Sequence, residues 1–144
     1  MPFSKDDKRN FEVFFRLKEK RQLNKSLSIL FLLKSKHKNS SVIFGLLGSV
    51  YFELKDYKKS SKNFKKALSI KPKSELASLG LFHCLMDLGR DRMALKELQR
   101  FLAISKPKLY KITIEELFEN VESFESEYDR KIINSIHYKW NSKK

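Results

Sequence analysis

Cysteine is nearly absent from this sequence, since Cys84 is the only one among 144 residues. A single thiol excludes an internal disulfide framework and a cluster of thiolates that would hold zinc. Its neighbours along the chain are mostly apolar, among them Leu81, Phe82 and Leu85. We therefore expect Cys84 to be a small buried side chain, and nothing about it implies an oxidising compartment.

Glycine and proline are also scarce, with four and three residues respectively, so few positions can break a helix. Hydrophobic residues make up 41% of the chain, which is enough for one core. The charged share of 33% is typical of helices with solvated faces. We expect an all-α fold in a single domain covering residues 1–144.

The sequence has no long apolar run. The longest, residues 27–33, is interrupted by Ser28 and falls far short of the ~20 residues that cross a bilayer. The first ten residues are rich in charge, unlike a secretory signal. We expect no membrane span and a cytoplasmic location, unless a signal peptide has been removed from the chain.

Motifs that carry catalysis are missing too. The sequence has no glycine-rich phosphate loop and no nucleophile elbow, and its three histidines lie far apart. His83 and Asp87 are one helical turn apart, which is more typical of a surface pair than of a catalytic one. Four glutamates in residues 115–122 would form a solvated helix face rather than a cation site. We expect no catalytic residues, no metal and no cofactor.

One segment, residues 41–72, has a regular pattern of large and small side chains. Its members are Phe44, Leu47, Gly48, Tyr51, Tyr57, Phe64, Ala67 and Pro72. At these spacings the segment resembles a tetratricopeptide repeat, a pair of antiparallel helices in about 34 residues. We assign the unit to residues 41–74, with helices over 41–54 and 57–70. The resemblance implies an α-α superhelix of stacked helical pairs that binds a partner and supplies no chemistry of its own.

Weaker versions of this unit are expected on both sides. Residues 75–108 are interpreted as a degenerate repeat whose first helix Ser74 caps. Residues 5–38 are interpreted as a repeat-like hairpin, because Ser4 and Asp7 have the spacing of a capping box.

Residues 109–144 lack the pattern and are expected to form two capping helices. Thr113 and Glu116 have the spacing of a capping box, and the helix they would begin has an apolar side made of Ile114, Leu117, Phe118, Val121 and Phe124. Ser126 is expected to begin a last helix whose apolar ladder ends at Trp140. The pair either caps the stack or folds back into its groove.

In the tetratricopeptide family, ligands usually lie in a concave groove lined by the first helix of each pair. The positions that the resemblance implies for this groove are Phe11, Phe15, Ser49, Phe52, Glu53, Leu79, His83, Met86 and Asp87. One subgroup holds terminal carboxylates with lysines, asparagines and an arginine, which are absent at the matching positions here. Because much of the surface is apolar, we expect another protein as partner, supplying an amphipathic helix or an extended apolar segment.

Basic charge dominates the chain, with a net charge of +14, and it lies almost wholly in the first half. Residues 1–74 contain 19 basic and six acidic side chains, whereas residues 115–129 contain seven acidic and no basic ones. One helix face carries a stripe of lysines suited to phosphates, made of Lys58, Lys62, Lys65 and Lys66.

Two other functions therefore stay open. The chain could be an RNA- or ribosome-associated protein that uses the lysine stripe. Arginine, the better reader of phosphates and bases, is much scarcer than lysine, which favours a solubilising role for the stripe. The chain could also be a self-associating structural subunit, with its groove filled by a second copy or by its own last helix.

Overall fold

The computed structural model describes residues 2–142, and this part of the chain folds into helices without strands. In chain order they are α1 (Lys5–Glu19), α2 (Leu23–Lys36), α3 (Ser41–Glu53), α4 (Tyr57–Ile70), α5 (Glu75–Asp87), α6 (Asp91–Ile104), α7 (Tyr110–Glu119), a 3-10 helix η1 (Val121–Ser123) and α8 (Glu127–Ser142). The expected all-α class is confirmed. Within the described residues, no helix combines the length and apolarity that a membrane span requires.

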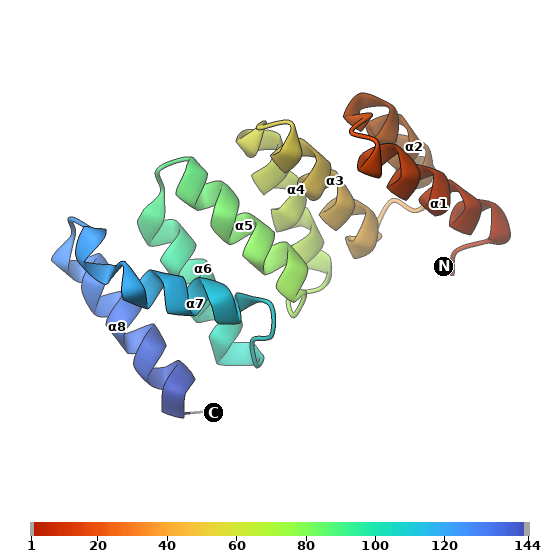
Figure 1. The fold of residues 1–144 in the computed structure, drawn as a ribbon. Coiled ribbons are helices and arrows are strands. Elements are labelled where there is room, and N and C mark those ends of the chain that lie inside the picture. Colours follow the sequence, from red (N-terminus) through yellow and green to blue (C-terminus); the bar gives the residue numbers. More distant parts are fainter. Residues whose placement is uncertain (1, 143–144) are drawn as a thin grey trace.

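Antiparallel helical pairs stack side by side into an elongated array, in which α3 and α5 lie in front of α4 and α6 (Figure 1). Successive helices from α3 to α6 pack closely along their lengths, both within a pair and between pairs. Each pair thereby buries its apolar face on the next, which one pair alone could not do. The α-α superhelix predicted from the repeat is confirmed.

Equivalent positions recur every 34 residues through the first three pairs. The turn inside each pair contains one residue with a positive φ, namely Arg21 (61°), Lys55 (63°) and Gly89 (74°). A small, fully buried side chain recurs in the second helix of each pair, at Ser26, Ser60 and Ala94. Different residue types occupy the equivalent positions of the three pairs. The shared turn conformation and close packing therefore come from the stacking of the helices and not from the preference of one residue type. This period supports our assignment of residues 5–38 and 75–108 as repeat units.

Local caps fix several of the predicted helix starts. Ser4 Oγ accepts the N–H of Asp7 at 3.1 Å, and Asp7 Oδ2 accepts the N–H of Ser4 at 2.9 Å, so the predicted capping box is present. Ser74 Oγ accepts the N–H of Ala77 at 3.3 Å. A cap of this kind satisfies a backbone donor that the helix itself cannot pair.

The predicted start of the seventh helix at Thr113 is wrong. α7 begins at Tyr110, and Thr113 lies buried inside it. Its start is held by α5, because the two carboxylate oxygens of Glu75 accept the N–H of Lys108 (2.9 and 2.7 Å) and one of them also accepts that of Tyr110 (2.8 Å). Local spacing cannot reveal a capping group that lies 35 residues away.

The apolar side predicted for α7 also extends beyond the end of the helix. α7 ends at Glu119, so Val121 lies in η1 and Phe124 in the connection to α8, both half-buried against the core. Ser126 starts the last helix as predicted, since its Oγ accepts the N–H of Asp129 at 3.2 Å.

The two terminal helices extend the stack and do not fold back along it (Figure 1). α8 packs against α6, α7 and η1. At the start of α7, Tyr110 is fully buried, with its hydroxyl 2.8 Å from Ser78 Oγ of α5. Ser78 in turn donates to Glu97 of α6 at 2.6 Å, so Tyr110 is the donor to Ser78. This buried chain of hydrogen bonds ties the terminal pair to the array.

Candidate functional site

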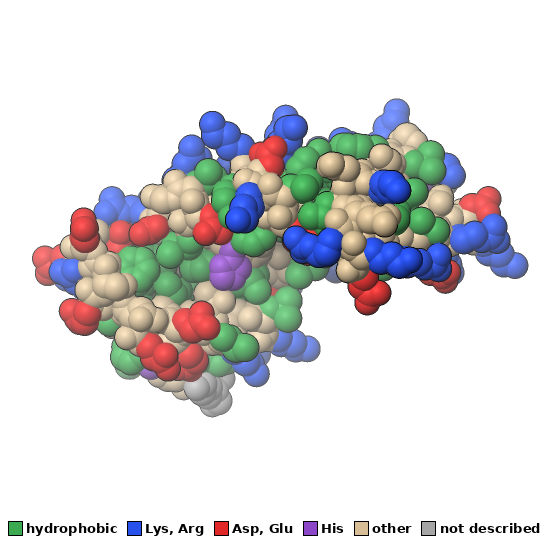
Figure 2. Space-filling model, turned by 45° about the horizontal axis from the view of Figure 1, so that its top comes forward, with side chains coloured by type: hydrophobic (Ala, Val, Ile, Leu, Met, Phe, Trp, Pro, Cys, Tyr) green, Lys and Arg blue, Asp and Glu red, His purple; other side chains and the backbone are tan. Residues whose placement is uncertain are grey.

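A hollow of about 240 Å³ opens where α3 and α5 lie side by side, and we call it the α3–α5 hollow. Its lining consists of Lys18, Ser49, Phe52, Glu53, Phe64, Leu76, Leu79, Gly80 and His83. Most of this lining is apolar. On the face shown in Figure 2, hydrophobic side chains surround a histidine near the middle of the molecule.

The floor of the hollow is the ring of Phe64, which rises from α4 between the two front helices. A Cβ added at Gly48 of α3 would lie 2.7 Å from this ring, and one added at Gly80 of α5 would lie closer still. Both distances are shorter than real contacts, so the two glycines make room for the aromatic ring. The hollow therefore results from glycine on both sides of one buried phenylalanine.

The hollow brings together five of the nine side chains predicted for the groove. They are Ser49, Phe52, Glu53, Leu79 and His83. Phe15 lies beside them, because it borders a neighbouring, more open depression together with Lys18 and Glu53. Phe15 is 51% exposed and so is available for contact.

The other three predicted residues are not in the hollow. Phe11 is half-buried against Phe3, with ring centroids 4.9 Å apart. Met86 lines a separate depression near the turn between α5 and α6. Asp87 is exposed at the end of α5, one turn beyond His83.

Gly80 and Phe64 were not predicted as groove residues. Phe64 is a member of the repeat signature, but the signature covers one helical pair and does not reveal that this ring also reaches α5 of the next pair. A signal did exist in Gly80, because a glycine in the middle of a helix is costly and often has a packing reason.

Charges at the two ends of the hollow differ in their pairing. At the α1 end, Glu53 pairs with Lys18 Nζ at 3.6 Å and with Arg21 at 3.5 Å. At the α7 end, Asp87 and Glu116 both lie close enough to His83 to act on its charge. Burial lowers the pKa of His83, and the two carboxylates only partly offset this, so the imidazole is neutral at neutral pH.

The described part of the chain contains neither a metal-binding cluster nor a reactive thiol. Within residues 2–142, no three histidine, cysteine, aspartate or glutamate side chains gather in a way that would hold a metal ion. Cys84 is fully buried, as predicted, with its Sγ 3.0 Å from Ser60 Oγ. Burial raises the pKa of the Cys84 thiol, which keeps it protonated and poorly nucleophilic.

The predicted lysine stripe lies on α4, outside the hollow. All four of its side chains, Lys58, Lys62, Lys65 and Lys66, are exposed. The Nζ of Lys66 is 5.9 Å from the ring centroid of Phe44, and Lys34 Nζ of α2 is 5.3 Å from the same centroid. The stripe thus continues onto the neighbouring pair.

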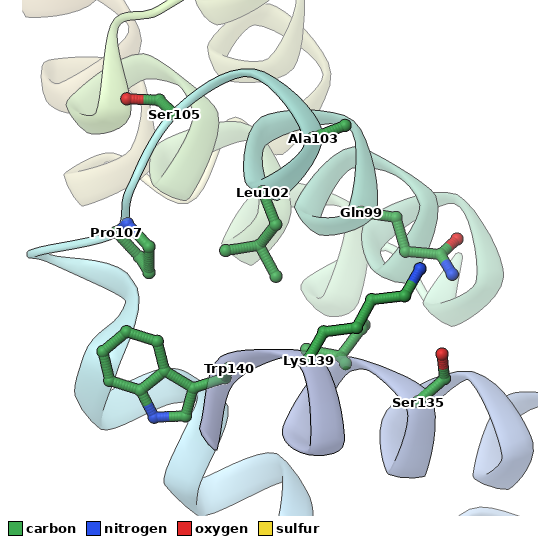
Figure 3. A pocket seen from close by; sticks show the side chains of 9 residues that line it. Gln99, Leu102, Ala103, Ser105, Pro107, Ser135, Lys139 and Trp140 are labelled. Carbon is green, nitrogen blue, oxygen red and sulfur yellow. The ribbon is translucent and has the colours of Figure 1, made fainter. Parts of the chain in front are cut away.

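A second hollow, of about 370 Å³, lies between α6 and α8 and was not predicted. Figure 3 shows Leu102 of α6 pointing toward α8, with Trp140 and Lys139 across the gap and Pro107 above. Trp140 Nε1 donates to Glu115 Oε1 at 3.2 Å, which fixes the indole at one edge. This hollow marks where the last pair packs less closely than the earlier ones.

Residues 42–74 match the family model of the tetratricopeptide repeat. The match covers α3, α4 and the turn that follows, so the resemblance of this segment is confirmed. No curated protein matches the chain in sequence.

Proposed function

Because the chain is a tetratricopeptide-repeat protein, we propose that it is a non-catalytic adaptor that binds a segment of another protein in the α3–α5 hollow. Repeats of this kind generally mediate contacts between proteins. The observation that carries the proposal is the hollow itself, an apolar depression over Phe64 that is open to solvent.

The lining of the hollow exposes apolar side chains that a bound partner would bury. Leu76 is 56% exposed, and Phe52 and Leu79 are half-buried at the rim. Burying one leucine-sized side chain contributes about 1.5–3 kcal/mol. Two or three such contacts contribute about 3–9 kcal/mol, and after the cost of ordering the segment they correspond to millimolar or weaker binding, so a tighter complex needs further contacts.

The terminal helices leave the site accessible. The described residues that line the hollow come from α1, α3, α4 and α5. α8 packs at the other end of the array, against α6 and α7. This arrangement argues against a groove filled by the chain's own last helix.

A pull-down that compares the wild type with Phe52→Glu and Leu76→Ser tests the proposal. Leu76 is exposed enough that its change leaves the fold intact, and Met93→Ser on α6, 46% exposed, is the matched control. We expect the same partner to be lost in both hollow variants and kept in the control. Retention by both hollow variants would contradict the proposal.

The lysine stripe favours one second candidate, an RNA- or ribosome-associated role. Its four exposed lysines would release counterions on binding a phosphate backbone. Changing Lys58, Lys62, Lys65 and Lys66 to glutamine should then weaken RNA binding and reduce its salt dependence. An unchanged affinity and salt slope would reject this role.

Two further properties, the oligomeric state and the cellular location, can be measured directly. A monomeric mass by sedimentation would exclude the structural-subunit interpretation, in which a second copy fills the hollow. Cell fractionation would check the expected location.

A further inference from the structure

The face of α7 nearest the hollow has unpaired negative charge. Ile112, Glu116 and Glu119 lie one above another on this helix, at spacings of four and three residues. Glu116 acts on the charge of His83, which places this face beside the hollow. Ile112 is 71% exposed, so the same face of α7 also presents an apolar side chain to solvent.

Three carboxylates at this end have no ion-pair partner within residues 2–142. They are Asp87, Glu116 and Glu119. Glu53 at the opposite end is already paired with Lys18 and Arg21. Figure 2 shows the same contrast over the whole face, with acidic side chains gathered at the α7–α8 end and basic ones at the α1–α2 end.

This pattern runs against the composition of the chain. Basic residues outnumber acidic ones by 14 over the whole chain, yet no described lysine or arginine forms an ion pair with these three carboxylates. They lie beside an apolar surface, where a bound segment would exclude water and strengthen their attraction to a cation. The neutral imidazole of His83 adds no opposing positive charge.

We infer that the bound segment places an apolar side chain in the α3–α5 hollow and a lysine or arginine toward Asp87 and Glu116. This inference rests on the proposed function and adds the chemistry of the partner. The unpaired acidic end also orients the segment, because its basic side must face α7 and not α1.

An acidic segment fits this surface less well than a basic one. Lys18 is the only lysine or arginine that lines the hollow within the described residues, and it is already paired with Glu53. A segment with an acidic side chain or a terminal carboxylate would displace this pair and meet repulsion at α7. Acidic ligands are therefore disfavoured at the α7 end.

Selection from a displayed library of random 12-residue peptides tests the inference. The immobilised wild type is compared with Asp87→Asn/Glu116→Gln and with Leu76→Ser. A matched control, Glu122→Gln/Glu125→Gln, removes the same charge from exposed sites between α7 and α8. Selected peptides are then synthesised and titrated by fluorescence anisotropy at low and high salt.

We expect selected peptides to combine an apolar residue with lysine or arginine. They should bind about three- to tenfold more weakly to the Asp87/Glu116 variant at low salt, as two exposed ion pairs predict, and bind the control normally. Binding should also fall with Leu76→Ser.

Two other outcomes overturn the inference and are distinguishable. Peptides that need Leu76 but lack a basic residue and ignore the Asp87/Glu116 change would reject the charge preference while leaving the hollow as a binding site. Peptides that bind equally to the Leu76 variant, or no enrichment at all, would reject the hollow as the site and the inference with it.

Discussion

Glycine at two positions decides whether the hollow exists. Gly48 could be recognised from the sequence, because it is part of the repeat signature and its role is local to one pair. Gly80 could not be assigned a role, since the ring it faces belongs to Phe64 of the preceding pair. Sequence spacing reports which residues share a helix face, but not which ring from another helix fills the space beside them.

Gly80→Ala should destabilise the chain by about 1–3 kcal/mol, because its new methyl group would overlap the Phe64 ring. Gly45→Ala on α3 is the matched control, since nothing lies within 4 Å of its added Cβ and alanine favours a helix by up to about 1 kcal/mol. Urea denaturation measures both. Equal stability of the two variants would show that the ring and the glycine are not in contact.

Asp7 and His37 form a buried pair that links the start of α1 to the end of α2. The side chains are 4% and 8% exposed, and Asp7 Oδ2 is 2.7 Å from His37 Nε2. The backbone N–H of Ser4, and after it the hydrogen bond with His37, lower the pKa of Asp7 below its ordinary value. The sequence predicted that Asp7 would pair with Ser4, three residues away, but not that it would also pair with His37, 30 residues away.

This pair predicts a loss of stability in acid. A carboxyl whose folded-state pKa is depressed stabilises the fold above the ordinary aspartate value of ~3.9, and the stabilisation is lost as the pH falls below it. Asp7→Asn should remove this part of the pH dependence, whereas Asp6→Asn, at a 78% exposed side chain, should not. Urea midpoints between pH 6 and pH 2.5 test the difference, and parallel curves for the two variants would contradict it.

Helices differ in how far the sequence predicts their bounds. α4 was predicted residue for residue, because Asp56 caps it locally and the repeat signature fixes its length. The start of α7 was missed because its backbone donors are satisfied by Glu75 of α5. When a residue of another helix caps a helix start, the local sequence does not indicate where that helix begins.

Glu75→Ala should loosen α7 and α8 from the array by about 1–2 kcal/mol, the range for loss of a helix cap. Hydrogen exchange would show faster exchange in α7 and α8 and unchanged protection in α3 and α4. The control is Glu119→Ala, which removes an exposed carboxylate from α7 itself. Uniform acceleration over all helices would contradict a local role for Glu75.

The molecule as a whole is a short array with two contrasting surfaces. The repeat pattern predicted its class and the order of its pairs, since these follow from apolar faces that must stack. The residues predicted for one groove are not all brought together, since Phe11 packs on Phe3 and Met86 lies in another depression. Which side chains line a hollow depends on contacts between helices of different pairs, and these contacts join residues that are far apart in the sequence.

Photo-crosslinking in cells tests most directly whether the α3–α5 hollow is the binding site. A benzophenone-bearing phenylalanine analogue would replace Leu76 in the hollow, Lys62 in the lysine stripe or Met93 on α6, all exposed positions. We predict a protease-sensitive adduct of one defined mass from position 76 alone. A nuclease-sensitive adduct from position 62, with none from position 76, would contradict the central claim.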